Sequence, residues 1–393
     1  MPWVEKTMMD QKMEMMLLWE SGTISIVELA KRFNVSRPTV YKWIARYKEK
    51  GYVGLTEDSR NPKYRKNRTP PHIEKEIVRQ RDKHRRWRAK KLLILVQAKY
   101  PNEKMPSEQT IYQILKRNNL VNPRKRRNRL EPQNPVFDPK EPNEIWSADF
   151  KGKFRMGNKI YCYPLTIADS YTRHVFCAKG LYSANLENTM KVFADVFKRY
   201  GLPKQIHTDN GQPFASSRAL GRLSQLSVWF MELGIEPVFS DPARPDQNGR
   251  HERMHRELKG EATRPPGHNM QSQQRKLNAF VKEYNEVRPH ESLGMRPPAA
   301  VHVLSERKYK KRVKPWVYPK ECIERYVCRN GAVRIGKREW LMVSKALSEK
   351  IVGFEPVGGK LYKLYFRQFF LGYADLDKLK VYDKMKYNRE RKL

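Results

Sequence analysis

The centre of the chain carries three strand-like segments in succession, and the short turns between them constrain the fold more than any other feature. The segments cover about 145–150, 159–169 and 173–179, with turns near Gly157 and Ser170. Each turn is too short for a crossover helix, so neighbouring strands are predicted to be antiparallel. The 393 residues in total predict two to four domains.

Helix and strand patterns alternate after these strands. The predicted elements are a helix from Ser183 to about Gly201, a strand at 205–208, a helix over about 216–234, a strand at 236–240, a helix carrying Glu252, and a helix over about 274–285. This order, β-β-β-α-β-α-β-α-α, is typical of the ribonuclease-H-like fold. We therefore predict a central α/β core with a mixed five-stranded sheet inside a multidomain α+β chain.

The two ends of the chain are much more basic than its centre. The chain has 80 Lys and Arg against 42 Asp and Glu, a net charge of +38. Residues 1–140 carry +18, residues 141–300 carry +6 and residues 301–393 carry +14. Such an excess repels itself and predicts a nucleic-acid partner. A basic surface that only improves solubility is the alternative.

The composition also indicates a compartment. Four cysteines in this length exclude a disulfide scaffold and favour a reducing environment. No apolar run approaches the roughly 20 residues that a membrane span needs, and the first residues lack the basic-then-apolar pattern of a signal peptide. We therefore expect a cytoplasmic protein without a membrane partner.

Residues 1–52 are predicted to form a helix-turn-helix DNA-binding domain. Ser25 and Glu28 have capping-box spacing before a second helix, and Ser36 precedes a third helix that ends near Lys50. In this motif the last helix enters the major groove. An ordinary three-helix bundle is the alternative. The residues predicted to face DNA are Arg37, Thr39, Tyr41, Lys42 and Arg46.

A second helix-turn-helix-like domain is predicted at 73–122, between basic linkers at 53–72 and 123–140. Ser107 is a cap for its last helix. For the second linker, a solvated tether or a localisation signal is the alternative. The basic residues predicted to contact DNA here are Arg60, Arg86, Arg88, Arg124, Arg126 and Arg127.

Three sequence blocks in the centre each carry a candidate catalytic acid. The blocks WSADFKG, IHTDNGQPF and DPARPDQNGRHERMHRELK contain Asp149, Asp209 and Glu252. They resemble the motifs of DDE transposases and retroviral-type integrases, especially bacterial insertion-sequence transposases with N-terminal helix-turn-helix domains. The resemblance covers nearly the whole of residues 7–300. It implies a catalytic core at 141–304 and a bacterial, nucleoid-associated enzyme.

The spacing of the acids departs from that family in one interval. Asp209 follows Asp149 by 60 residues, which is ordinary, whereas Glu252 follows Asp209 by 43, which is long for the family. The additional residues are assigned to 216–228. Asp169 also follows a predicted strand, and we interpret it as a turn acid rather than a metal ligand.

The resemblance implies that Asp149, Asp209 and Glu252 are both catalytic residues and metal ligands. Two Mg²⁺ ions per site, for which Mn²⁺ can substitute, would serve phosphodiester cleavage and joining. The implied activity is cleavage and strand transfer by a DNA transposase that binds the terminal inverted repeats of a mobile element. Arg253, His255 and Lys259 lie on the predicted helix of Glu252 and are candidate phosphate contacts. A solvated basic helix face is the alternative.

The implied partners are double-stranded DNA, as element ends and as target, and further copies of the chain in a DNA-bound homodimer or higher oligomer. Zinc is not expected, because no cysteine pair has zinc-finger spacing, and ATP is not expected, because no phosphate-binding glycine loop occurs. The alternative functions are an element-derived DNA-binding regulator without transposition activity and a structure-selective nuclease.

Residues 315–383 are predicted to form a small basic β-barrel. Their sequence alternates apolar and polar residues, and Asn330 with Gly331 is a strong hairpin signal. In integrases and phage transposases such a domain holds DNA or a partner subunit, and a β domain without a binding role is the alternative.

Overall fold

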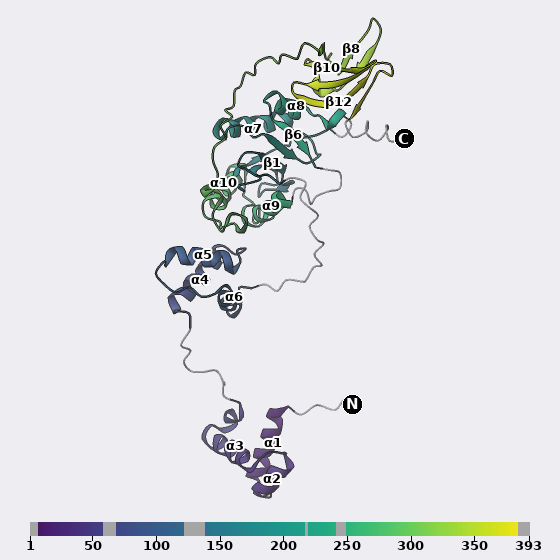
Figure 1. The fold of residues 1–393 in the computed structure, drawn as a ribbon. Coiled ribbons are helices and arrows are strands. Elements are labelled where there is room, and N and C mark those ends of the chain that lie inside the picture. Colours follow the sequence, from purple (N-terminus) through teal and green to yellow (C-terminus); the bar gives the residue numbers. More distant parts are fainter. Residues whose placement is uncertain (1–6, 58–67, 122–137, 217–218, 241–248, 384–393) are drawn as a thin grey trace. The chain divides into compact units, whose positions relative to one another are not determined.

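The computed structural model describes residues 7–57, 68–121, 138–216, 219–240 and 249–383 (Figure 1). The chain divides into two compact units, Met1–Arg68 and Thr69–Leu393. None of the helices in the described ranges has the length and apolar character needed to cross a membrane.

The first unit is a three-helix bundle. Its elements are α1 (Met8–Glu20), α2 (Ile26–Arg32), α3 (Arg37–Lys50) and the 3₁₀ turn η1 (Gly51–Leu55). The Ser25 hydroxyl accepts from the Glu28 N–H, and Glu28 accepts from the Ser25 N–H, which confirms the predicted capping box. Ser36 precedes α3, but its hydroxyl bonds the Thr39 hydroxyl instead of a backbone N–H. The fully buried side chains include Met16, Leu29, Val40 and Leu55.

The second unit begins with three more helices. These are α4 (Pro71–Lys83), α5 (Ala89–Lys99) and α6 (Glu108–Arg117). The Ser107 hydroxyl accepts from the Thr110 N–H, as the cap prediction required. Ile73, Trp87, Leu92 and Ile111 form the centre of their shared core.

A mixed sheet lies next along the chain. Its strands are β1 (Ile145–Phe150), β2 (Phe154–Arg155), β3 (Tyr161–Asp169), β4 (Val175–Leu181), β5 (Gln205–Thr208) and β6 (Glu236–Phe239). β1, β3 and β4 pair antiparallel, as predicted, whereas β1, β5 and β6 pair parallel. The sheet has six strands instead of the predicted five, because the two-residue β2 pairs with the start of β3.

Helices cover both faces of this sheet. α7 (Leu186–Tyr200) and α8 (Gln225–Glu232) bury Phe193 and Phe230 against Trp146 and Ile167. α9 (Gly249–Ala262) and α10 (Met270–Glu286) bury apolar side chains against β3 and β4 on the other face. The core therefore has three layers, with β1 in the middle of the sheet.

The long helix predicted over 216–234 is wrong. The described part of this segment holds the short turn η2 (Leu220–Arg222) and then α8. Gly221 and Arg222 have φ values of 55° and 58°, which a continuous right-handed helix does not allow. Ser224 then caps α8 through the Ser227 N–H.

The strands after the core form an antiparallel sheet in the order β13-β12-β11-β10-β7, with a separate β8–β9 pair. The predicted β-barrel is not confirmed, because β13 and β7 are open ends of the larger sheet. Asn330 and Gly331 do form a turn, at whose base Val327 bridges Val333. The elements are β7 (Ile323–Tyr326), β8 (Ala332–Arg334), β9 (Trp340–Met342), β10 (Ile351–Gly358), β11 (Leu361–Phe366), β12 (Phe369–Asp375), β13 (Lys380–Asp383), η4 (Glu291–Leu293), η5 (Pro298–Ala300) and η6 (Lys345–Leu347).

The core is joined to the C-terminal sheet by packing and by an ion pair. Leu223, Val228 and Met231 belong to the apolar cluster of the C-terminal sheet, and Lys350 pairs with Glu232 at 2.6 Å. Along the connecting segment, the Arg307 guanidinium donates to backbone carbonyls at the ends of α7 and α8, including Gly234 O at 2.7 Å, and Tyr309 packs on the core. Core contacts thus continue past 304.

Candidate active site

Asp149 lies near the end of β1, between the two helix layers. Its side chain is 19% exposed. Burial, and then the negative charge of Asp209, raise the pKa of Asp149 from 3.8 to about 7, and the charge of Glu252 acts in the same direction. The electrostatic environment of Asp149 therefore disfavours its ionised form unless a cation is close.

Asp209 is held beside Asp149 by the strand register. β1 and β5 run parallel with Ala148 opposite Thr208, so the two aspartates that come next are at the same level of adjacent strands. Asp209 accepts from the Gly211 N–H at 3.1 Å. This register is consistent with the prediction that the two acids belong to one catalytic site.

Glu252 lies in the first turn of α9, on its exposed side. Met254 and Leu258 are buried in the core, whereas Arg253 and Lys259 are exposed, as Glu252 is. Residues 241–248, including Asp241 and Asp246, lie outside the described residues. Glu252 and the two basic side chains thus present both signs of charge on one helix surface.

The donor set fits a hard divalent cation by its chemistry, although the residues that the structure describes contain no group of three His, Cys, Asp or Glu side chains arranged to hold a metal. Carboxylate oxygens are the ligands that Mg²⁺ prefers. A cation between Asp149 and Asp209 would relieve the repulsion that raises the pKa of Asp149.

A chain of buried polar groups lies behind Asp149. His251 and His255 project from α9 toward the sheet and are 2% and 4% exposed. His251 Nδ1 is 2.8 Å from Ser147 Oγ, and both histidine Nε2 atoms lie within 2.7 Å of Thr166 Oγ1. His255 Nδ1 is 3.5 Å from Asp149 Oδ2. The sequence prediction missed this network.

The single proton of the Thr166 hydroxyl determines how the two rings are protonated. Thr166 Oγ1 donates to the Asp149 carbonyl at 3.0 Å, so it accepts from both histidine Nε2–H groups. Burial lowers the pKa of His251 to about 3, and that of His255 falls as well, so both rings are neutral. The bare Nδ1 of His255 faces Asp149 and gives it no positive charge.

The prediction that His255 contacts phosphate is wrong, because its ring is packed inside the core. The apolar spacing of Met254, Leu258 and Ala262 was the available signal, since His251 and His255 fall on the same helix face. Asp169 is confirmed as a turn acid, since it accepts from the Thr172 hydroxyl at 2.6 Å and from two backbone N–H groups.

Family models match the same part of the chain. One model of the integrase core domain matches residues 139–245, and a second matches residues 233–298. Residues 139–298 form an integrase core domain. Upstream of it, a helix-turn-helix domain model matches residues 11–63 and a homeodomain-like domain model matches residues 39–115.

Relatives of this integrase core occur in insertion elements. An uncharacterized 39.2 kDa protein of insertion element IS476 from Xanthomonas euvesicatoria is 27% identical over 227 residues, covering 55% of this chain and 60% of that protein. An uncharacterized 31.7 kDa protein of IS407 from Burkholderia multivorans is 28% identical over 169 residues, covering 41% and 56%. The alignments thus span less than two thirds of either relative.

Among solved structures, the catalytic core domain of HTLV-2 integrase in complex with magnesium is similar to this chain. It is 17% identical and covers 42% of this chain and 99% of its own, with a TM-score of 0.33.

The remaining candidate DNA contacts differ in exposure. Arg37, Tyr41 and Lys42 are exposed on α3, whereas Thr39 and Arg46 are half-buried. Outside the integrase core, Arg86 and Arg88 are both exposed before α5, and Arg86 Nε also pairs with Glu257 of α9 at 3.3 Å. Four of the predicted contacts lie outside the described residues, namely Arg60, Arg124, Arg126 and Arg127.

Proposed function

We propose that this chain is a DNA transposase that binds the terminal inverted repeats of a mobile element and catalyses metal-dependent strand cleavage and strand transfer. The observation that carries the proposal is the register that sets Asp149 beside Asp209, with Glu252 close enough to affect the pKa of Asp149. The integrase core match and the insertion-element relatives support it.

Asp149, Asp209 and Glu252 are the proposed ligands of two divalent cations, Mg²⁺ or Mn²⁺. When bound, such cations activate a water molecule and stabilise charge on the leaving oxygen. The protein orients the first ligand through the buried Thr166 hydroxyl, which holds the Asp149 carbonyl. Arg253 and Lys259, exposed on the helix of Glu252, are the proposed contacts to phosphates of the DNA strand.

The two proposed steps use the same kind of displacement at phosphorus. In cleavage, water attacks, the bond between phosphorus and the 3′-oxygen breaks, and the 3′-oxygen takes a proton. In strand transfer, this 3′-hydroxyl loses its proton and attacks a target phosphodiester. A new P–O bond forms and the target strand's own 3′-oxygen leaves. Energy is conserved in the exchanged ester bond, so ATP is not required.

DNA recognition is assigned to the helical domains. The exposed residues Arg37, Tyr41 and Lys42 belong to α3, whose N-terminal turn would approach base edges in the major groove. Two element ends must be held together for joining, so we propose a homodimer or higher oligomer on DNA. A purely monomeric complex active in joining would contradict this part of the proposal.

The test is cleavage and joining of a labelled element end with Mg²⁺, comparing the natural chain with Asp209→Asn. This change removes a charged ligand and nearly keeps the side-chain shape, so we expect products to fall at least a hundredfold while DNA binding persists. Asp195→Asn is the matched control, because Asp195 is exposed on α7 and pairs only with nearby Lys198 at 3.3 Å in the described structure.

Other outcomes of this cleavage and joining assay would contradict parts of the proposal. Equal activity of Asp209→Asn and the natural chain would remove Asp209 from the catalytic site. Cleavage without joined products would favour a structure-selective nuclease. Binding without any cleavage, with correct ends and Mg²⁺ present, would favour an element-derived regulator.

A further inference from the structure

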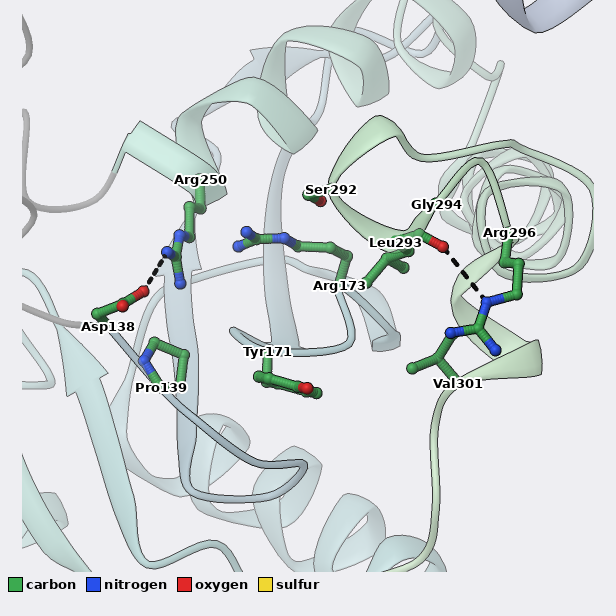
Figure 2. A pocket seen from close by; sticks show the side chains of 10 residues that line it. All are labelled: Asp138, Pro139, Tyr171, Arg173, Arg250, Ser292, Leu293, Gly294, Arg296 and Val301. Carbon is green, nitrogen blue, oxygen red and sulfur yellow. Dashed lines mark hydrogen bonds and ion pairs between the residues drawn. The ribbon is translucent and has the colours of Figure 1, made fainter.

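A cavity of about 420 Å³ lies beside the start of α9, and its lining is basic (Figure 2). Arg250 reaches it from the start of α9, Arg173 from the turn between β3 and β4, and Arg296 from the segment after η4. Asp138 is the acidic residue of the lining. The cavity therefore places three guanidinium groups against one carboxylate.

The arginines are incompletely neutralised. Arg250 pairs with Asp138 at 2.9 Å, and the Asp138 side chain is 72% exposed. Arg173 donates to the Ser170 carbonyl at 2.7 Å, and Arg296 Nε is 3.4 Å from the Leu293 carbonyl. Across the described ranges, neither Arg173 nor Arg296 forms an ion pair with a carboxylate. The pocket keeps an excess of positive charge.

Arg173 is in an unfavourable position for a cation. Figure 2 shows its guanidinium directed toward that of Arg250. Burial, and then the charge of Arg250, lower the pKa of Arg173 to about 10. An anion between the two guanidinium groups would remove this repulsion, and guanidinium matches the oxygen geometry of phosphate.

We propose that this pocket binds a backbone phosphate of DNA at a subsite separate from the three catalytic acids. The proposal rests on the transposase function and adds a place where the DNA strand is held. Arg250 and Glu252 are two residues apart on α9 and so point about 200° apart around the helix. DNA that crosses the start of α9 would therefore contact the pocket on one side and the acids on the other.

Asp138 occupies the ligand's place beside Arg250 in the free protein. Its carboxylate is exposed and attached to a segment that precedes the core strands, so a phosphate can replace it in the ion pair with Arg250. Replacing Asp138 and replacing an arginine should therefore change DNA affinity in opposite directions. Asp138→Asn removes the competing charge and should strengthen DNA binding, whereas loss of an arginine should weaken it.

The experiment measures binding of the full chain to one 30-base-pair duplex in EDTA at several salt concentrations. Removing one phosphate-binding side chain reduces the slope of log K against log salt by about 0.9. We expect Arg296→Gln to reduce the slope by about this amount, with binding roughly eightfold weaker near 0.1 M salt. Asp138→Asn should bind severalfold more tightly than the natural chain.

Arg275→Gln is the matched control, because Arg275 is exposed on α10 and does not line the pocket. Its slope should equal that of the natural chain. Arg296 is exposed, so its replacement is not expected to disturb folding. Melting curves of all variants check this.

Unchanged slopes and affinities in both pocket variants would overturn the proposal. A second arm measures melting of the protein with inorganic phosphate alone. If phosphate raises the melting temperature of the natural chain but not of Arg296→Gln, and the salt slope of DNA binding is unchanged, free phosphate is the ligand. That result would also overturn the DNA subsite. Because these measurements exclude divalent ions, they are independent of cleavage and joining. The Asp209→Asn assay alone decides the transposase function.

Discussion

The Thr166 side chain connects three groups of the candidate active site. Its hydroxyl contacts the Asp149 carbonyl and the Nε2 atoms of His251 and His255, all inside the core. Buried donors and acceptors that lose a partner cost about 1–3 kcal/mol each. The position of Asp149 therefore depends on a network that a single hydroxyl completes.

Thr166→Val should destabilise the core by at least about 2 kcal/mol, because it leaves two histidine N–H groups unsatisfied while keeping the side-chain volume. Cleavage should fall about tenfold with DNA binding unchanged. Hydrogen exchange of the β1 and β3 amides measures the local stability. The control is Thr189→Val on α7, where the buried hydroxyl bonds one carbonyl at 2.7 Å. Equal costs at the two sites would refute the network.

At the scale of elements, α4 is anchored by a carboxylate that is 5% exposed. Glu76 accepts from Arg79 at 2.6 Å, from Gln80 at 2.7 Å and from Lys99 of α5 at 2.8 Å. The bonds from Arg79 are the main reason why the pKa of Glu76 falls from 4.5 to about 2. Folding thus favours the ionised form of Glu76.

The stability of α4 should consequently depend on pH. A lowered pKa gives stability that is complete above the ordinary value of 4.5 and is lost as the pH falls toward about 2. Glu76→Gln should cost on the order of 1–3 kcal/mol near pH 7 and should flatten the pH dependence below 4.5. Hydrogen exchange of the α4 amides between pH 7 and pH 3 provides the measurement. Parallel pH curves for the two proteins would contradict the assignment.

The sequence predicted those elements whose physical causes are local. Short turns determined that β1, β3 and β4 are antiparallel, and the capping residues Ser25 and Ser107 marked true helix starts. The prediction of a helix over 216–234 was wrong because Arg222 adopts a left-handed conformation, which is uncommon for arginine and cannot be predicted from its residue type. The open C-terminal sheet was taken for a barrel because alternation does not specify which strands close.

For the candidate site too, the sequence indicated features with local causes and missed those that depend on the tertiary fold. Asp149 and Asp209 could be predicted as site residues because each lies at or beside the end of a short strand within a distinctive block. The pocket arginines come from positions 173, 250 and 296, and only the tertiary fold brings them to one cavity. His255 was assigned by its charge type, although helical spacing placed it on the apolar face of α9.

For the whole molecule, the two compact units predict different responses to truncation. Removal of residues 1–68 should leave the melting temperature of the core within about 1 °C, because this segment is a separate unit. Removal of residues 310–393 should destabilise the core by several kcal/mol, because it exposes Leu223, Val228 and Met231, at about 1.5–3 kcal/mol for each side chain fully uncovered. Calorimetry of the two truncated chains measures both effects. Full stability of the chain ending at 309 would show that the sheet does not stabilise α8.

The anchoring of Arg307 and Tyr309 on the core also limits how far the C-terminal sheet can travel. Tyr318 is already part of that sheet, since its hydroxyl donates to Ile351 O at 3.0 Å. Residues 310–317 connect these two anchors, and Arg367 of the sheet already donates to the Lys314 carbonyl among them at 2.9 Å. Even with that hydrogen bond broken, eight residues span at most about 28 Å when fully stretched. Two copies can therefore exchange their C-terminal sheets only in assemblies where α8 of the neighbour, the helix on which the sheet packs, lies within that distance of Tyr309.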